Sequence, residues 1–287
     1  MSVILENVRK HYGSVHALDG VNFELERGIT GLLGPNAAGK TTLLRCLATV
    51  LAPDSGKINI LGFDPDRPQD RTEIRRRIGY LPQEPGFYRS FTCFEFIDYL
   101  AILKEHTDTT RRHVEVRRVL ELTGLSDKST TRIRKLSGGM RRRLALAQAL
   151  LGSPGFVILD EPTAGLDPEL RCRFRELITE LAVERTILLS THQTEDVVAI
   201  CDRVIVLDNG QIRFDGPPAG LIALAAGRVW IANEKPASAR ITWRTVDGTY
   251  RSVGDPPAGA VTIEPTIEDG YLLLVGSAAS DEAGQAA

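Results

Sequence analysis

The sequence predicts an α/β protein with a mostly parallel β-sheet wrapped by helices. An antiparallel β subdomain, an inserted helical subdomain and a small C-terminal β-rich extension are expected in addition. The glycine-rich stretch Gly34–Thr41 joins a short apolar run to a segment with leucines at helical spacing. Apolar runs alternate with helical patterns over residues 156–208. Residues 84–152 are largely helical in pattern and interrupt the alternation, which indicates an insertion.

The first part of the chain carries most of the predicted strands. Val3–Val8 and Val21–Gly28 have strand patterns and are separated by a turn at His11–Gly13. We expect further strands at residues 29–33, 56–62 and 77–83, and a helix at Lys40–Leu51.

Most of the predicted helices lie between residues 92 and 200. They are expected at residues 92–104, 111–122 and 141–151. Strands at 156–161, 186–190 and 203–208 then alternate with helices at 168–183 and 195–200. Asn209–Gly210 is typical of a hairpin turn and ends the alternation.

Composition indicates a globular protein with one large domain, or one large and one small domain. The chain has 287 residues, of which 43% are hydrophobic and 25% charged, with a formal net charge of −2. No apolar run reaches the ~18–20 residues that span a bilayer, and the first residues lack the apolar core of a signal peptide. The cysteines are far apart, which fits reduced thiols in a cytosolic protein: Cys46, Cys93, Cys172 and Cys201.

Charge is unevenly distributed along the chain. Residues 67–143 hold eighteen Lys and Arg against ten Asp and Glu. Such a stretch is typical of proteins that bind nucleic acid or an anionic membrane surface. Solvated helix faces explain it as well, and we favour that interpretation.

The pattern G-x-x-x-x-G-K-T at Gly34–Thr41 predicts a phosphate-binding loop. Between a strand and a helix N-terminus, the backbone N–H groups of the loop point inward and the helix dipole favours negative charge. Lys40 would reach the terminal phosphates, and the Thr41 hydroxyl would bind Mg²⁺. The predicted nucleotide-binding residues of this loop are Gly34, Pro35, Asn36, Ala37, Ala38, Gly39, Lys40, Thr41 and Thr42.

Two carboxylates, Asp160 and Glu161, follow the apolar run Phe156–Leu159. A buried parallel strand delivers its terminal acids to the carboxyl edge of the sheet, beside the glycine loop. Asp160 is predicted to hold Mg²⁺ and Glu161 to polarise an attacking water. By itself this motif fits a strand that ends at a solvated acidic turn equally well, but the glycine loop favours the metal site.

Seven motifs in a fixed order make the sequence similar to the ATP-binding-cassette ATPases, the nucleotide-binding subunits of ABC transporters. They are Tyr12, the Walker A stretch GPNAAGKT, Gln83 in YLPQ, the signature LSGGM, the Walker B stretch FVILDE, the D-loop Ala164–Asp167 and His192 in STHQ. The resemblance covers residues 2–216. It implies a P-loop NTPase fold with an ATP-binding domain at residues 1–216, ATP and Mg²⁺ as ligands, and ATP hydrolysis.

The resemblance also implies roles for single residues. Tyr12 would stack on adenine, and Gln83 would contact Mg²⁺ or the attacking water. His192 would donate hydrogen bonds to the γ-phosphate and to the D-loop of a facing subunit. Thr41, Gln83 and Asp160 are thus the expected metal ligands, and Glu161, His192 and Gln83 the expected catalytic residues.

The signature forms a second anion site. Ser137, Gly138 and Gly139 begin a predicted helix, where N–H groups and the serine hydroxyl are free to bind an anion. In the family this site caps the γ-phosphate held by another subunit, which implies an ATP-dependent homodimer or a heterodimer with a related cassette. Ala37 and Met140 depart from the family pattern, since glycine and glutamine are usual there. If position 37 needs a positive φ, alanine would cost about 1 kcal/mol.

Three functions fit these motifs: the ATPase subunit of a membrane transporter, a soluble ATPase of this family that acts on nucleic acid or the ribosome, and a nucleotide-binding regulator without turnover. The chain has one cassette and no zinc motif or long coiled coil, which disfavours the second function. Lys40, Glu161 and His192 disfavour the third. We favour the first, at the cytoplasmic face of the membrane, with a separate permease and no nucleic-acid partner. Phe87 and Tyr88 are predicted to line a groove for a permease helix.

Residues 217–276 form a predicted C-terminal extension. A short helix within residues 217–227 and strands at 228–234, 239–246 and 249–253 are expected. Thr266 and Asp269 are spaced as a capping box, which predicts a helix at Ile267–Val275 with Gly270 as a weak point. This ending resembles the tails of cassettes that serve drug- and polysaccharide-type exporters with two-subunit permeases. Residues 277–287 are expected to be disordered.

Overall fold

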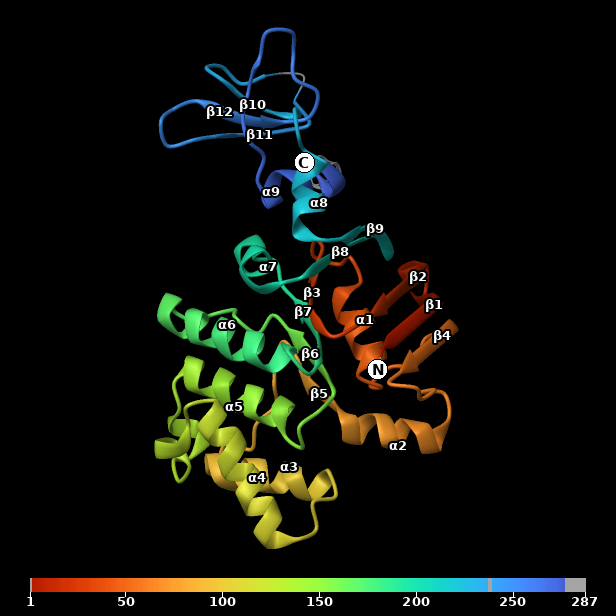
Figure 1. Ribbon diagram of the computed structural model, residues 1–287, viewed down its shortest axis with the longest axis vertical. Coiled ribbons are helices and arrows are strands. Elements are labelled where there is room, and N and C mark those ends of the chain that lie inside the picture. The colour runs from red at the N-terminus through yellow and green to blue at the C-terminus, as the bar shows by residue number, and fades with distance from the viewer. Residues whose placement is uncertain (1, 237–238, 277–287) are drawn as a thin grey trace.

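The computed structural model describes residues 2–236 and 239–276. A large α/β part and a small C-terminal lobe together form an elongated molecule, with the lobe at the top of Figure 1. The disorder expected for residues 277–287 concerns a segment outside the described residues. Among the described residues, no helix has the length and apolar character needed to cross a membrane.

A six-stranded sheet lies at the centre of the large part, in the strand order β5-β6-β7-β3-β8-β9. The pairs from β5 to β8 are parallel, and only β9 runs antiparallel to its neighbour. The strands are β3 (Gly28–Leu33), β5 (Ile78–Leu81), β6 (Phe156–Asp160), β7 (Thr186–Ser190), β8 (Arg203–Asp208) and β9 (Gln211–Gly216). Every residue of β6 and β7 is buried, as in a sheet covered on both faces. The predicted mostly parallel sheet is confirmed.

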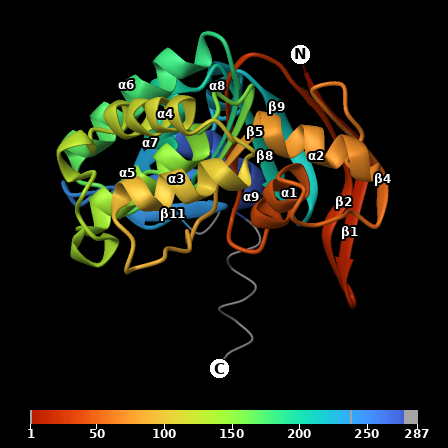
Figure 2. The ribbon, with the colours of Figure 1, turned by 90° about the horizontal axis from the view of Figure 1, so that it is seen from below.

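An antiparallel sheet packs against one face of this central sheet. It consists of β1 (Val3–Tyr12), β2 (Val15–Leu25) and β4 (Ser55–Ile60) in the order β2-β1-β4. Its apolar side chains share a core with the central sheet and with α1 (Lys40–Leu47). Figure 2 shows it on the side opposite the helical insertion.

The inserted helices lie on the other side of the molecule (Figures 1 and 2). The insertion contains α3 (Cys93–Leu103), α4 (Thr109–Leu122), α5 (Gly138–Leu150) and two short 3₁₀ turns, Ser126–Lys128 and Ile133–Lys135. Their apolar residues join one large core with α6 (Pro168–Ala182), α7 (Thr194–Ile200) and the central sheet. This core holds the signature helix α5 against the strand that carries Asp160.

Two helices differ from the expectation. The helix predicted at Lys40–Leu51 ends at Leu47, because the chain leaves the helical conformation and Thr49 adopts a left-handed backbone with φ 57°. A helix that the pattern does not predict, α2 (Pro68–Arg77), precedes β5. It buries only Ile74, so its sequence has no apolar stripe.

The C-terminal lobe contains a four-stranded antiparallel sheet in the order β11-β12-β10-β13. Its strands are β10 (Val229–Ala232), β11 (Ile241–Arg244), β12 (Tyr250–Val253) and β13 (Val261–Thr262). Two helices join the sheet to the large part, α8 (Pro218–Ala223) and α9 (Ile267–Val275). Leu221, Ile267 and Val275 belong to the large core rather than to the small core of the lobe.

The helix α9 has the predicted bounds, and Thr266 and Asp269 form the predicted capping box. The structure adds a packing role for Gly270 that its interpretation as a weak point of the helix did not include. A Cβ atom at this position would lie 2.1 Å from the Leu221 carbonyl oxygen. The glycine therefore allows α9 to approach the backbone of α8 closely.

Candidate functional site

The glycine loop and the end of β6 meet at the carboxyl edge of the central sheet, around a cavity of about 310 Å³. Its lining includes most of the residues predicted to bind nucleotide. The lining residues are Tyr12, Val15, Ala17, Pro35, Asn36, Ala37, Ala38, Gly39, Lys40, Thr41, Thr42, Gln83, Asp160 and Glu161. Tyr12 is about half exposed at the edge of this cavity. The structure thus brings together segments up to about 150 residues apart in the sequence.

The loop has a conformation that restricts its residues. A Cβ atom at Gly34 would lie 2.3 Å from the Leu207 carbonyl oxygen, and one at Gly39 would lie 2.1 Å from that of Ala17. Ala37 has φ 65°, so position 37 does lie in the left-handed region that costs a non-glycine residue about 1 kcal/mol. The loop keeps this conformation because its glycines are tightly packed against the neighbouring strands.

Lys40 is folded back over the loop. Its Nζ atom donates hydrogen bonds to the Gly34 carbonyl at 2.5 Å and the Pro35 carbonyl at 2.9 Å. Burial lowers the pKa of Lys40 below its ordinary value, while the carboxylates of Glu161 and Asp160 counteract the effect. The cavity thus holds a cation whose hydrogen-bond partners are only loop carbonyls, which an anionic phosphate can replace.

The two carboxylates at the end of β6 have different surroundings. Asp160 is buried, and its Oδ2 atom lies 3.5 Å from the Thr41 hydroxyl, which donates to it. Burial raises the pKa of Asp160, and the neighbouring Glu161 carboxylate raises it further. Glu161 has a left-handed backbone with φ 50°, which turns the chain sharply after β6.

His192 contacts Glu161 rather than any residue of the glycine loop. Its Nδ1 atom lies 2.8 Å from Oε2 of Glu161, and its side chain is 64% exposed. The expected hydrogen bonds of His192 to a phosphate and to a facing subunit stay predictions. In this chain the imidazole orients the Glu161 carboxylate at the edge of the cavity.

Gln83 is exposed and lines the same cavity, as expected for a residue that contacts the metal or water. Its carbonyl accepts a hydrogen bond of 2.7 Å from Arg142. The Arg142 guanidinium also donates to the carbonyls of Pro162, at 3.0 Å, and Asp160, at 3.3 Å. Arg142 therefore connects the signature helix to both the Q-loop and the end of β6, a role that the sequence did not reveal.

A second connection involves Asp196, which is fully buried. It accepts hydrogen bonds from the Thr163 hydroxyl at 2.6 Å and from the Arg175 guanidinium at 2.8 Å. These contacts join the segment after Glu161 to α6 and to α7, the helix that follows His192. This network could not be predicted from the sequence, because its three members come from three separate elements.

The signature lies outside the cavity of the glycine loop. Ser137 caps α5, since its hydroxyl accepts a hydrogen bond of 3.2 Å from the Met140 N–H. Ser137 and Gly138 are exposed. Gly138 lines a different hollow, of about 880 Å³, together with the D-loop residues Ala164 and Gly165. One chain therefore does not bring the signature and the glycine loop together.

The two aromatic residues after Gln83 differ in exposure. Tyr88 is exposed and contacts the rings of Phe91 and Tyr99. Phe87 is half-buried, with its ring centroid 5.4 Å from that of Phe96. Phe87 is therefore partly a core residue, and Tyr88 is the ring available at the surface.

Comparisons with known proteins agree with this geometry. A family model described as ABC transporter matches residues 18–164. An uncharacterised ABC transporter ATP-binding protein from Bacillus subtilis, YxlF, is 40% identical over 213 residues, which cover 74% of this chain and 70% of that protein. The Nod factor export ATP-binding protein I of Bradyrhizobium diazoefficiens is 38% identical over 226 residues, covering 77% of this chain and 72% of that protein. A probable multidrug ABC transporter ATP-binding protein from Escherichia coli, YbhF, is 32% identical, covering 88% of this chain and 48% of that protein.

Solved structures of cassettes are similar as well. The dimeric structure of the bacterial ABC transporter cassette MJ0796 superposes with a TM-score of 0.70 and 25% identity, covering 75% of this chain and 98% of that one. A dimeric structure of the same cassette in a post-hydrolysis state, bound to ADP and Pi, has a TM-score of 0.69, also at 25% identity, and covers the same shares.

Proposed function

The chain belongs to the ABC transporter family and is an ATP-binding ATPase of that family, and we propose that it powers export through a separate membrane-spanning permease. The relatives named as export and multidrug proteins support the direction of transport. In this proposal the protein is peripheral and lies at the cytoplasmic face of the cell membrane.

One observation carries the proposal. The glycine loop and the carboxylates Asp160 and Glu161 share one cavity, whereas Ser137 and Gly138 lie exposed elsewhere on the same chain. Each chain therefore presents two incomplete half-sites for a nucleoside triphosphate. Two copies arranged head to tail complete both half-sites, with the signature of one copy against the nucleotide held by the other. A related cassette could take the place of the second copy.

The loop residues fit the phosphates of ATP and a magnesium ion. Thr41, Asp160 and Gln83 offer a hydroxyl, a carboxylate and an amide oxygen, the hard ligands that Mg²⁺ takes together with phosphate oxygens. The 3.5 Å contact between Thr41 and Asp160 keeps two of these ligands adjacent. When bound, Mg²⁺ would neutralise charge on the β- and γ-phosphates. Lys40 would exchange its bonds to the loop carbonyls for bonds to phosphate oxygens.

Hydrolysis requires a water molecule aligned with the γ-phosphate. Glu161 accepts a proton from this water while the water oxygen attacks phosphorus and the bond to the β-phosphate oxygen breaks. His192 Nδ1 lies 2.8 Å from Glu161 Oε2 and orients the carboxylate until the imidazole binds a phosphate or the facing subunit. Gln83 is held at its carbonyl by Arg142, so its side chain can reach the nucleotide cavity from a fixed backbone.

The γ-phosphate also controls assembly. Ser137, Gly138 and Gly139 of the second copy contact it only in the dimer, so ATP favours the closed state and loss of the γ-phosphate releases it. Tyr88, exposed beside the Q-loop, and Phe87 behind it offer an aromatic surface to a helix of the permease. Movement of the Q-loop would then transmit dimer closure to the permease.

Assembly provides the test of this proposal. Glu161→Gln protein, which retains ATP, is expected to shift from monomer to dimer in size-exclusion chromatography when ATP and Mg²⁺ are added. Introducing Ser137→Arg as a second substitution in this protein should block the shift. The arginine places a positive charge and a larger side chain against the nucleotide held by the second copy. Ser126→Arg, at another exposed serine of the helical subdomain, is the matched control and should leave the shift unchanged. An ATP-dependent dimer that persists with Ser137→Arg would contradict the head-to-tail arrangement.

A further inference from the structure

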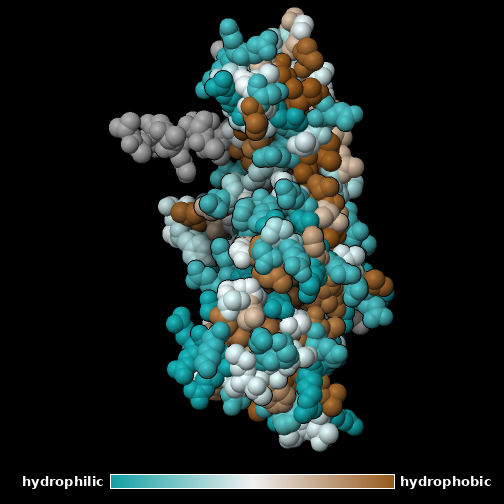
Figure 3. All heavy atoms as spheres, turned by 90° about the vertical axis from the view of Figure 1, so that its left-hand side faces the viewer, coloured by the Kyte–Doolittle hydropathy of each residue, from teal (hydrophilic) through white to brown (hydrophobic). Residues whose placement is uncertain are grey.

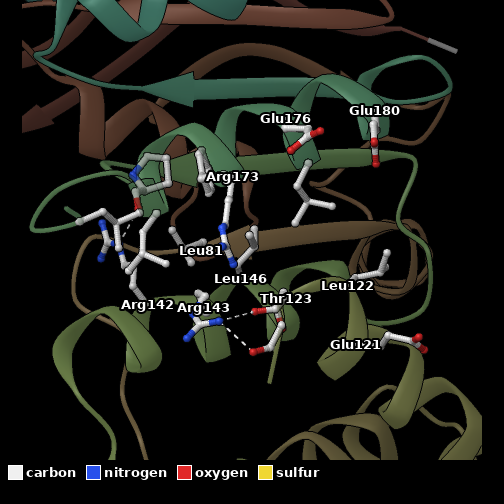
Figure 4. Close-up of a pocket in the computed structure, with 16 residues that line it drawn as sticks. Leu81, Glu121, Leu122, Thr123, Arg142, Arg143, Leu146, Arg173, Glu176 and Glu180 are labelled. Atoms are coloured by element: carbon white, nitrogen blue, oxygen red, sulfur yellow. Dashed lines mark hydrogen bonds between the residues drawn. The ribbon is translucent and has the colours of Figure 1, made fainter. Parts of the chain in front are cut away.

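A second cavity of about 340 Å³ lies between the helical subdomain and α6, away from the glycine loop. Figure 4 shows it between α6 above and the ends of α4 and α5 below. The residues that line it are Leu81, Glu121, Leu122, Thr123, Gly124, Arg142, Arg143, Leu146, Pro162, Leu166, Leu170, Arg173, Phe174, Glu176, Leu177 and Glu180. The proposed nucleotide chemistry uses none of its carboxylates.

The floor of this cavity is apolar. Leu81, Leu146 and Phe174 are buried residues of the large core. Leu122 and Leu177 are partly exposed at its edges. Figure 3 shows the side of the molecule that carries α6, where hydrophobic residues lie among hydrophilic ones. A cavity of this size and lining lies at the lower end of the about 300–1,000 Å³ range of small-molecule pockets, and such pockets often form where two subdomains meet.

The charged groups of the cavity are separated, with the arginines toward one end and the glutamates toward the other in Figure 4. Each of the three arginines donates to a partner within the protein, although Nε of Arg143 is buried without a partner among the described residues. Arg143 donates to the Thr123 and Gly124 carbonyls, and Arg142 to the carbonyls described above. Arg173 forms an ion pair of 2.6 Å with Glu169.

The glutamates have no such partners. Within residues 2–236 and 239–276, no hydrogen bond or ion pair joins the carboxylates of Glu121, Glu176 or Glu180 to another residue. Glu176 and Glu180 are one turn apart on α6, and Glu121 lies across the cavity from them at the end of α4. The glutamates are exposed and unpaired at one end of the cavity. Arg142 and Arg143 keep their positive charge at the other end, but they are half-buried and already donate to carbonyls.

We propose that this cavity is a binding site for an amphipathic cation. The apolar body of the ligand lies against the accessible side chains of Leu122, Leu170 and Leu177 over the buried floor. Its ammonium or guanidinium group lies at the end of the cavity that holds Glu121, Glu176 and Glu180. Burial of the body supplies most of the binding free energy, and the carboxylates select the positive charge. The site is separate from the nucleotide cavity, so it does not depend on the proposed transport function.

Calorimetric titration of the full-length protein without nucleotide tests the site. The probe is octyltrimethylammonium, and octanoate, with a chain of similar length and the opposite charge, is the comparison ligand. Saturable binding is expected for the cation and not for the anion, and raising the salt concentration should weaken the binding of the cation. Equal binding of octanoate, or no binding of the cation, would overturn the proposal.

Removing the charges of two glutamates tests whether the cation binds in this cavity. Glu176→Gln with Glu180→Gln should weaken binding of octyltrimethylammonium about fivefold, the scale expected for two partly solvated charge contacts. Glu184→Gln with Glu234→Gln removes the same net charge at exposed positions outside the cavity and should leave the affinity unchanged. All four residues are exposed, so folding is not at risk, and thermal unfolding of both proteins verifies this. Equal affinities of the two double variants would place the cation elsewhere and refute the assignment.

Discussion

At the scale of single residues, Glu161 and His192 form the contact that most directly concerns ATP hydrolysis. The carboxylate is largely buried, whereas the imidazole that holds it is mostly exposed. An exposed imidazole can leave this contact at little cost when a phosphate or a second subunit offers it another partner. The pair thus combines a positioned carboxylate with a histidine that is free to change partners.

Glu161→Gln should bind ATP with near wild-type affinity and hydrolyse it more than tenfold more slowly, because an amide cannot accept the proton of the attacking water. Steady-state hydrolysis and nucleotide binding by the purified protein measure the two effects separately. Lys40→Ala is the comparison, since loss of the loop cation should weaken binding itself. Hydrolysis at the wild-type rate by Glu161→Gln would mean that another group serves as the base.

Arg142 acts through the backbone of other residues and so is a positioning residue. Its guanidinium joins the carbonyls of Gln83, Asp160 and Pro162, and burial lowers its pKa. A lysine at this position keeps the positive charge but has a single nitrogen, which cannot span three carbonyls from different segments.

Arg142→Lys is therefore expected to lower kcat for ATP hydrolysis about tenfold or more while changing the affinity for ATP less than about threefold, since the loop that holds the phosphates is untouched. The same change should lower the free energy of unfolding by about 1.5–3 kcal/mol through lost hydrogen bonds to a charged group. Arg141→Lys is the matched control, because Arg141 is exposed and its guanidinium, within the described residues, donates to the Leu136 carbonyl alone. Equal losses of kcat in the two variants would exclude the positioning role.

The difference between Lys40 and Arg142 shows which functional residues a sequence can reveal. Lys40, Asp160 and Glu161 lie in contiguous motifs whose spacing itself reflects the chemistry, and the structure brings them to one cavity. Arg142 and Asp196 have partners 18 to 59 and 21 to 33 residues away in the chain. Because their roles arise only from tertiary contacts, Arg142 is indistinguishable in the sequence from its exposed neighbour Arg141.

At the scale of elements, α9 was predictable because its start is encoded locally. Thr266 and Asp269 cap each other's backbone, and Asp269 also pairs with Arg251 of β12. By contrast, α2 has no apolar stripe, and its position depends on packing around Ile74. What α9 packs against could not be predicted from the sequence either, so the packing role of Gly270 appears only in the structure.

Gly270→Ala tests the close approach of α9 to α8. The new Cβ atom would lie 2.1 Å from the Leu221 carbonyl oxygen, so the helices must separate. We expect the free energy of unfolding to fall by about 1–3 kcal/mol, the usual cost of overpacking, although alanine favours helix more than glycine does. Urea unfolding followed by circular dichroism measures the change.

Gly220→Ala on α8 is the control for this prediction. The nearest atoms to its added Cβ would belong to side chains, the Phe214 ring at 3.3 Å and Pro217 Cδ at 3.7 Å. A small change of either sign is expected there, because a ring can shift slightly while a backbone carbonyl cannot. A Gly270→Ala protein as stable as wild type would show that the contact between the two helices is loose.

At the scale of the whole molecule, the lobe is attached to the ATPase part through its helices. Leu221, Ile267 and Val275 belong to the large core, and Tyr271 of α9 has its pKa raised to about 12 by burial and by the nearby Asp208. The sheet of the lobe packs on a small core of its own. The sequence predicted its three main strands, but the order β11-β12-β10-β13 depends on pairing across the lobe and could not be predicted. We propose a domain boundary at residue 216. It separates the residues that line the nucleotide cavity from the C-terminal lobe, although α8 and α9 share the large core with the ATPase part.

Deletion of residues 217–287 tests whether the lobe belongs to the catalytic machinery. All residues that line the nucleotide cavity lie before residue 162, so the truncated protein should retain measurable ATP hydrolysis. It should also unfold at a lower temperature, because removal of α8 and α9 exposes apolar surface that Leu221, Ile267 and Val275 cover. Truncation after Gly276 is the control, because it removes none of the helices and strands that the structure describes. Its rate of ATP hydrolysis and its melting temperature should match those of the full-length protein. A folded protein lacking residues 217–287 that binds ATP but shows no turnover would show that the lobe supplies part of the catalytic machinery, contrary to this prediction.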